Sequence, residues 1–179
     1  IIAASEVESI IAASESALAQ LCDANGIDES HGVRHASAVL QHAQRAITAS
    51  TTPLSLPTQL AIRLAALLHD ADDRKYFPNS TKIYETARRI MKDVGTPPDV
   101  VEESVLMISL VSCSANGNSA PPATLDRPEL LWPRWADRLE AVGEVGVRRC
   151  YEYNKRVGAP LACETTPRPS TEHGGSTHD

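Results

Sequence analysis

The hydrophobic residues of this chain recur in the rhythm of amphipathic helices. In the first segment Val7 lies three and four residues before Ile10 and Ile11, and Leu18 lies seven residues after Ile11, a spacing that places them on one helix face. Alternating patterns typical of strands are nearly absent. The pattern predicts helices over residues 5–22, 30–49, 57–69, 80–94, 96–112 and from 127–133 to 156. We therefore expect an all-α bundle of five to seven helices.

The length fits one domain. The 179 residues amount to 19.3 kDa, the size of a single globular unit with a short extension. Hydrophobic residues make up 42% and aromatic residues only 4%, so the core is expected to be aliphatic. Residues 164–179 are polar and show no apolar periodicity. We expect a domain over residues 1–163 and a polar tail over 164–179.

The composition also bears on compartment and partners. No apolar run reaches the roughly 18 residues of a membrane span, and no basic leader precedes the first helix, so we expect a cytoplasmic protein with no membrane partner. The four cysteines lack a Cys-x-x-Cys pair, which excludes a zinc knuckle. They are expected to be small buried residues in a reducing compartment. They are Cys22, Cys113, Cys150 and Cys163.

The charge balance narrows the class of ligand. Lys plus Arg is 17 against 23 for Asp plus Glu, a formal charge of −6. An acidic chain without a long basic run is a poor binder of a nucleic-acid backbone, so we expect no nucleic-acid polymer as partner. Any phosphate that the protein binds must be held by a local pocket.

One dipeptide ends an apolar helix and carries candidate chemistry. His69-Asp70 closes the segment AIRLAALLHD, and a buried imidazole and carboxylate must both be satisfied. A metal ion would do so, and so would a hydrogen-bond network. From the dipeptide alone the network is the favoured interpretation.

Two further residues favour a metal. His35 shares a helix face with Val39, and Asp137 lies in WADRLEAVG on a face shared with Ala141 and Val145. An inward carboxylate needs a cation or several donors. Two imidazoles and two carboxylates on three helices could therefore converge, a donor set that suits Mn, Fe, Co, Ni or Zn.

The same residues resemble a known family. The order His35, then His69-Asp70, then Asp137 resembles the HD-domain metal-dependent phosphohydrolase superfamily, over residues 30–162. It is most similar to small nucleoside-triphosphate pyrophosphohydrolase-like HD proteins, through HGVRHASAV, ALLHDADDRKYF and ADRLEAVGEVGVRRCYEY. The resemblance implies a single HD-domain helical bundle whose metal-binding core spans about residues 30–156.

The resemblance also implies roles for individual residues. The metal ligands would be His35, His69, Asp70 and Asp137. Asp73 would orient or deprotonate water, Lys75 would neutralise phosphate charge, and His31 would lie beside the metal or contact phosphate, with a surface histidine as its alternative. For the remaining cations a solvated surface charge stays an open alternative to a phosphate contact; they are Arg34, Lys82, Arg88 and Arg138.

Several nearby residues are expected to be structural. Asp72 reads as a solvated loop charge. Trp132 and Trp135 are expected to anchor the last helix rather than to stack on a base. Residues 116–118, Asn-Gly-Asn, are typical of an ordinary turn.

The interval between the second and last motifs predicts the number of metals. No histidine lies between His69 and Asp137, whereas HD proteins with two metals take further histidines from that interval. We therefore expect one divalent ion (Mn, Co, Ni, Fe, Zn or Mg). The metal ligands and the pair Asp73 and Lys75 that the resemblance implies lead us to expect hydrolysis of a small phosphorylated metabolite. The first choice is a nucleoside triphosphate releasing pyrophosphate, and the second is a phosphomonoester.

Two alternatives belong to other classes. One is a non-phosphate HD enzyme such as a cyanamide hydratase-like hydro-lyase, because an acidic protein surface is compatible with a neutral substrate. The other is a non-catalytic, metabolite-binding HD domain. The oligomeric state is open, with a homodimer among the candidates.

Overall fold

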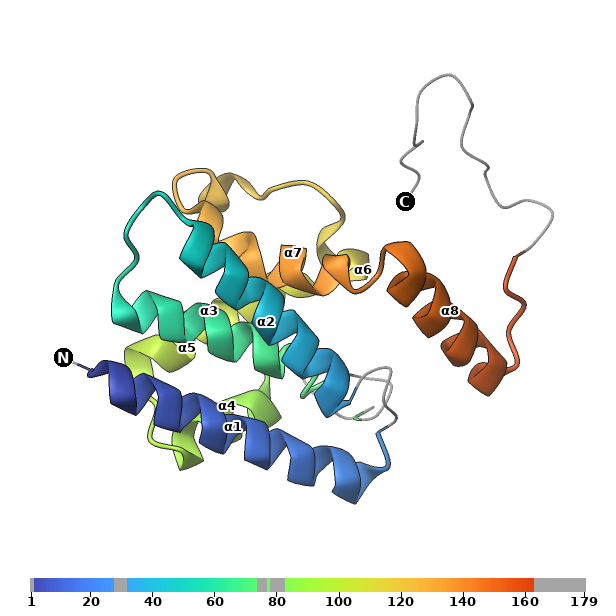
Figure 1. The fold of residues 1–179 in the computed structure, drawn as a ribbon, viewed down its shortest axis with the longest axis horizontal. Helices are drawn as coiled ribbons and strands as arrows, with labels where there is room; N and C mark the ends of the chain where they lie inside the picture. The colour runs from blue at the N-terminus through green and yellow to red at the C-terminus, as the bar shows by residue number, and fades with distance from the viewer. Residues whose placement is uncertain (1, 28–31, 74–76, 78–82, 163–179) are drawn as a thin grey trace.

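The protein is built of helices, as Figure 1 shows. This computed structural model describes residues 2–27, 32–73, 77 and 83–162. Within these residues there is no strand, and seven helices have eight residues or more. The prediction of an all-α fold with five to seven helices is confirmed. The elements are α1 (Ala4–Asn25), α2 (Val33–Ala49), α3 (Leu56–Leu68), α4 (Glu85–Asp93), α5 (Pro98–Val111), α6 (Cys113–Asn116), η1 (Pro122–Thr124), η2 (Pro128–Leu131), α7 (Trp132–Leu139) and α8 (Gly143–Val157).

Helix α3 lies at the centre of the bundle. Every side chain from Leu60 to Leu68 is buried, which follows from a segment that is apolar nearly all round. Helices α1, α2, α5 and α7 pack around it. The Ser55 hydroxyl caps its N-terminus by accepting a hydrogen bond from the Thr58 N–H at 3.3 Å. A helix surrounded in this way carries His69, its last-turn neighbour, into the interior.

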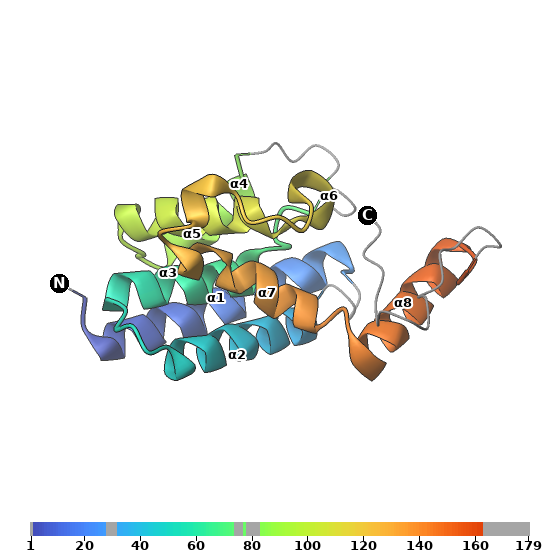
Figure 2. The same cartoon turned by 90° about the horizontal axis from the view of Figure 1, so that it is seen from above.

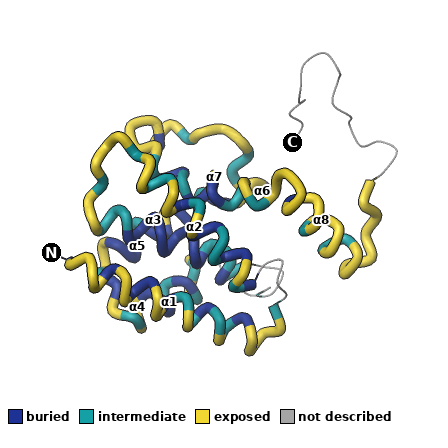
Figure 3. Tube along the Cα trace, viewed as in Figure 1, coloured by how far each residue is buried: buried dark blue, intermediate teal, exposed yellow. Residues whose placement is uncertain are grey.

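The outer helices bury one face each, as the alternation of dark and yellow stretches in Figure 3 shows. Helix α1 buries Val7, Ile10, Ile11 and Leu18, the stripe that the sequence predicts. On α2 the buried set includes Val39 and Ala43 together with His35. His35 therefore reaches the core side of α2 with its apolar neighbours.

The last predicted helix is in fact two. Helix α7 ends at Leu139 and α8 begins at Gly143. Gly143 has a φ of +63°, a left-handed conformation that glycine adopts without steric cost. The expectation of one helix to residue 156 was wrong because the chain turns at this glycine.

Helix α8 extends away from the bundle, as Figures 1 and 2 show. Gly146 is its only buried residue. Ala141 and Val145 are exposed, so the prediction that they share an inward face with Asp137 was wrong. The spacing of apolar residues continues from α7 into α8, but the chain changes direction between the two helices, so these residues do not share one face.

Two cysteines also depart from expectation. Cys22 is buried, but Cys113 and Cys150 are exposed, so they are not core residues. Cys163 and the predicted tail over residues 164–179 lie outside the described residues. Within the described part of the chain, no helix combines the length and apolar character needed to cross a membrane.

Candidate metal centre

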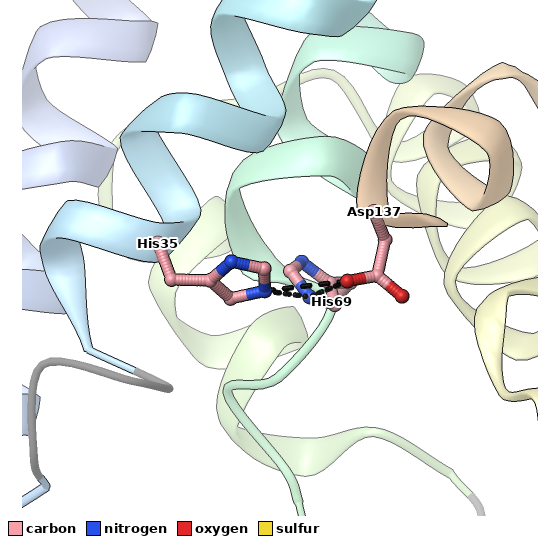
Figure 4. Close-up of side chains that lie close together, drawn as sticks. All are labelled: His35, His69 and Asp137. Carbon is pink, nitrogen blue, oxygen red and sulfur yellow. Dashed lines mark hydrogen bonds and ion pairs between the residues drawn. The ribbon is translucent and has the colours of Figure 1, made fainter. Parts of the chain in front are cut away.

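Three helices bring two imidazoles and a carboxylate to one point (Figure 4). His35 comes from α2, His69 follows the last turn of α3, and Asp137 comes from α7. The two Nε2 atoms lie 3.3 Å apart. Asp137 Oδ1 lies 3.3 Å from the Nε2 of His35 and 3.6 Å from that of His69. One donor atom from each residue thus lies within 4.8 Å of the other two.

Asp70 adds a second carboxylate to this triad. Its Oδ2 lies 3.3 Å from His69 Nε2 and 3.8 Å from His35 Nε2. The residue directly follows His69, so the end of α3 supplies one nitrogen and one oxygen together. The four residues that the resemblance implies as ligands are therefore neighbours in space.

The spacing fits a metal ion. Ligand atoms about 2.1 Å from a shared ion, at tetrahedral or octahedral angles, lie roughly 3.0–3.5 Å from one another. The shorter distances between the imidazole and carboxylate atoms match that range, and imidazole nitrogen with carboxylate oxygen is a donor set of Mn, Fe, Co, Ni and Zn. A ring orientation supports the fit: the Nδ1–H of His69 donates to the Ala66 carbonyl oxygen at 2.9 Å, which turns Nε2 toward the cluster.

The site is buried on one side and open on the other. The side chains of His35 and His69 are each 2% exposed, whereas those of Asp70 and Asp137 are 27% and 29% exposed. The Nδ1 atom of His35 is buried and has no hydrogen-bond partner within the described residues. Among these four residues of the described structure, the carboxylates are therefore the accessible part of the cluster.

Charges within the cluster shift two pKa values. Burial alone would lower the pKa of His69, but the carboxylates of Asp70 and Asp137 outweigh it and raise that pKa to about 9. Burial alone would raise the pKa of Asp137, but the hydrogen bond from His35 and the charge of His69 hold it below its ordinary value. Both shifts follow from the close approach of imidazoles and carboxylates within the cluster.

Several predicted site residues cannot be placed. His31, Lys75 and Lys82 lie outside the described residues. Asp73 is half-buried in the turn after the dipeptide, where its N–H donates to the Asp70 carbonyl oxygen at 3.0 Å. Arg34 is exposed on the first turn of α2, beside His35.

Arg138, the residue after Asp137, has structural contacts of its own. Its Nη2 donates to the Gly117 carbonyl oxygen at 2.7 Å, and its guanidinium lies 4.9 Å from the centre of the Trp135 ring. Trp132 packs against the core, but Trp135 is 41% exposed, so Trp135 does not anchor the helix as expected. One nitrogen of the Arg138 guanidinium therefore binds the backbone at Gly117.

Arg134 was missed by the sequence reasoning. Its side chain is completely buried, its Nε donates to the Leu110 carbonyl oxygen at 2.6 Å, and its Nη1 donates to that of Ser119 at 2.9 Å. Asn116 closes the same segment by donating to the carbonyl oxygens of Ser109 and Ser112. Nothing local in the sequence distinguishes a structural arginine of this kind from a surface one.

Two other charges have structural partners. The Asp72 carboxylate accepts hydrogen bonds from the Thr86 and Ala87 N–H groups at 3.0 and 2.9 Å, so the prediction of a solvated charge was wrong: it caps α4. Arg88 forms a two-pronged ion pair with Glu102. The sequence left a phosphate contact and a solvated surface charge open for Arg88, and the structure shows its guanidinium paired with a carboxylate.

A second contact joins the two outer helices of the site. His42 Nε2 donates to Glu140 Oε1 at 2.9 Å, with side chains 23% and 13% exposed. The spacing held a signal: His42 follows His35 by two helical turns, and Glu140 follows Asp137 by three residues.

A surface pocket of about 440 Å³ lies elsewhere, against α4 and α5. Its lining includes Arg89, Lys92 and Val101 and shares no residue with the cluster. The convergence of donor atoms, not this hollow, therefore marks the candidate functional site.

Comparison with known proteins yields relatives without a stated function. No protein-family model matches the chain. The chain is 35% identical over 153 residues to the "Uncharacterized protein L803" of Acanthamoeba polyphaga mimivirus, a match covering 79% of this chain and 60% of that relative. The chain thus spans less than two thirds of the relative's length.

A solved structure shares the fold. A Lactobacillus plantarum protein, determined as a structural-genomics target, superposes with a TM-score of 0.65 at 22% identity, over 94% of this chain and 72% of its own. At that identity the likeness speaks for the fold alone. The arrangement of helices in this chain is therefore one that a solved protein also has.

Proposed function

We propose that this chain is a mononuclear, metal-dependent phosphohydrolase of the HD superfamily that acts on a small phosphorylated metabolite, with nucleotides as the first substrates to test. The observation that carries the proposal is the meeting of His35, His69 and Asp137 from three helices within 4.8 Å, with Asp70 beside them. The motif resemblance supplies the reaction class.

The donor set indicates what the site would hold. Two neutral imidazoles and two carboxylates would balance a divalent cation and leave coordination positions open on the exposed carboxylate side. A divalent ion held there would supply Lewis-acid activation of water and charge neutralisation at a phosphoryl oxygen.

The chain's own residues would orient and bind the reactants. Asp73, three residues after Asp70 and half-buried, would accept a proton from the attacking water. Arg138 would bind a phosphate oxygen with the donors that its contact with Gly117 leaves over, because a guanidinium has five N–H groups. Arg34 and the predicted Lys75, Lys82 and His31 would contribute further positive charge for phosphate binding.

The test combines metal loading with product analysis. Protein stripped by a chelator would be reloaded separately with Mn²⁺, Co²⁺, Ni²⁺, Fe²⁺, Zn²⁺ and Mg²⁺ and given nucleoside mono- and triphosphates. Release of phosphate or pyrophosphate is expected with at least one ion. Asp137→Ala should lose both metal and turnover, whereas the exposed control Asp126→Ala should keep both.

Three outcomes would contradict the proposal. Metal retained by Asp137→Ala at the parent level would remove the site. Metal binding with turnover of cyanamide and none of any phosphate compound would favour the hydro-lyase. Binding of nucleotides by a metal-loaded protein that never releases product would favour a non-catalytic domain.

A further inference from the structure

Asp137 lies where its helix is least stable. Helix α7 has eight residues, Trp132–Leu139, and Asp137 is in its last turn. Short helices are marginal alone, and their ends lack hydrogen-bond partners. The chain then turns at Gly143 and leaves the bundle. Something other than α7 itself must hold the Asp137 carboxylate against His35.

The contact between His42 and Glu140 meets this need. Glu140 follows the last residue of α7 as its C-cap, and its N–H donates to the Asp137 carbonyl oxygen at 2.9 Å. Its side chain receives the His42 hydrogen bond from α2. Its own carbonyl oxygen accepts from Arg149 Nη1, also at 2.9 Å. Glu140 is thus fixed by its side chain and by its backbone.

The same two helices therefore meet twice. His35 on α2 faces Asp137 on α7 at 3.3 Å, and two turns further along α2 His42 faces Glu140 at 2.9 Å. A hydrogen bond to a carboxylate in a partly buried setting is stronger and more directional than an exposed one. The two contacts therefore join the same pair of helices at two points.

We infer that His42 and Glu140 are positioning residues that hold Asp137 at metal-binding distance from His35. The inference rests on the proposed metal centre and extends it to residues outside the ligand set. Groups that orient metal ligands typically change metal affinity by about 10- to 100-fold when removed. Neither residue belongs to the cluster of His35, His69 and Asp137.

Metal affinity separates this role from a general effect on stability. Co²⁺ binding to the full chain would be followed by calorimetry and by the absorption spectrum of the ion. We expect His42→Ala and Glu140→Ala each to weaken binding about tenfold. The double variant should be no weaker than either single one, since the two residues act as a unit. His42→Gln should restore affinity, because an amide N–H can also donate to Glu140.

A matched control breaks an ion pair between other helices. Glu8→Ala removes the carboxylate that binds Arg63 through both guanidinium nitrogens at 2.6 and 2.8 Å, joining α1 to α3. It should lower the unfolding temperature and leave Co²⁺ affinity at the parent value. Equal weakening by Glu8→Ala, or parent-like affinity in both His42→Ala and Glu140→Ala, would overturn the inference. A parent protein that takes up no metal would instead overturn the proposed function, and this inference with it.

Discussion

Asp72, two residues after Asp70, caps helix α4, and this cap can be tested directly. Helix α4 begins after Tyr84, whose φ of 56° is left-handed and whose side chain makes no cap. The Asp72 carboxylate supplies the cap from a distant part of the chain, through the N–H groups of Thr86 and Ala87. Asp72→Ala would leave both groups without this partner.

The magnitude follows from the two hydrogen bonds and the charge. Loss of a side-chain cap costs about 0.5–2 kcal/mol, and loss of a negative charge at a helix N-terminus costs about 0.3–1 kcal/mol. We expect the Asp72→Ala free energy of unfolding to fall by about 2 kcal/mol. For a chain of this size that lowers the unfolding temperature by roughly 4–8 °C.

Thermal unfolding followed by circular dichroism would measure the change. Asp72→Asn keeps one acceptor oxygen and should fall between the parent and Asp72→Ala. Asp126→Ala, which changes an exposed aspartate, should stay within about 0.5 kcal/mol of the parent. The capping argument fails if Asp72→Ala unfolds within a degree of the Asp126→Ala control.

Three further predictions concern the site and its connection to α8. Folding raises the pKa of His69 from 6.5 to about 9, so protonated His69 stabilises the metal-free protein fully below pH 6.5, and this stabilisation is lost as pH rises through 9. Urea unfolding across that range in the presence of a chelator should show the fall in the free energy of unfolding. A rise in that free energy would contradict the prediction. Metal at a hundred times its Kd should stabilise the parent by about 2.7 kcal/mol, measured as a thermal shift that Asp137→Ala abolishes and Asp126→Ala keeps. A Cβ on Gly146 would overlap the backbone of Ala141, so Gly146→Ala should speed amide exchange in the first turn of α8 but not in α3, and equal protection would refute the overlap.

The helices themselves were accessible from local pattern. The stripe from Val7 to Leu18 and the apolar run before His69 fix which faces are buried, because an α-helix repeats every 3.6 residues whatever surrounds it. The same logic placed His35 and His69 on inward positions. The break at Gly143 was missed because a single glycine is tolerated within many helices, and its left-handed backbone is decided by where the next segment can go.

By itself, the sequence determined the helix order, the aliphatic core and the identity of residues able to hold a metal. Only the tertiary structure decided that His35 and Asp137, about a hundred residues apart, stand at 3.3 Å, that Asp72 caps α4, and that His42 meets Glu140. The physical reason is range: periodicity and capping act within a few residues of one helix. Distances between helices depend on how their surfaces interlock in the packed core.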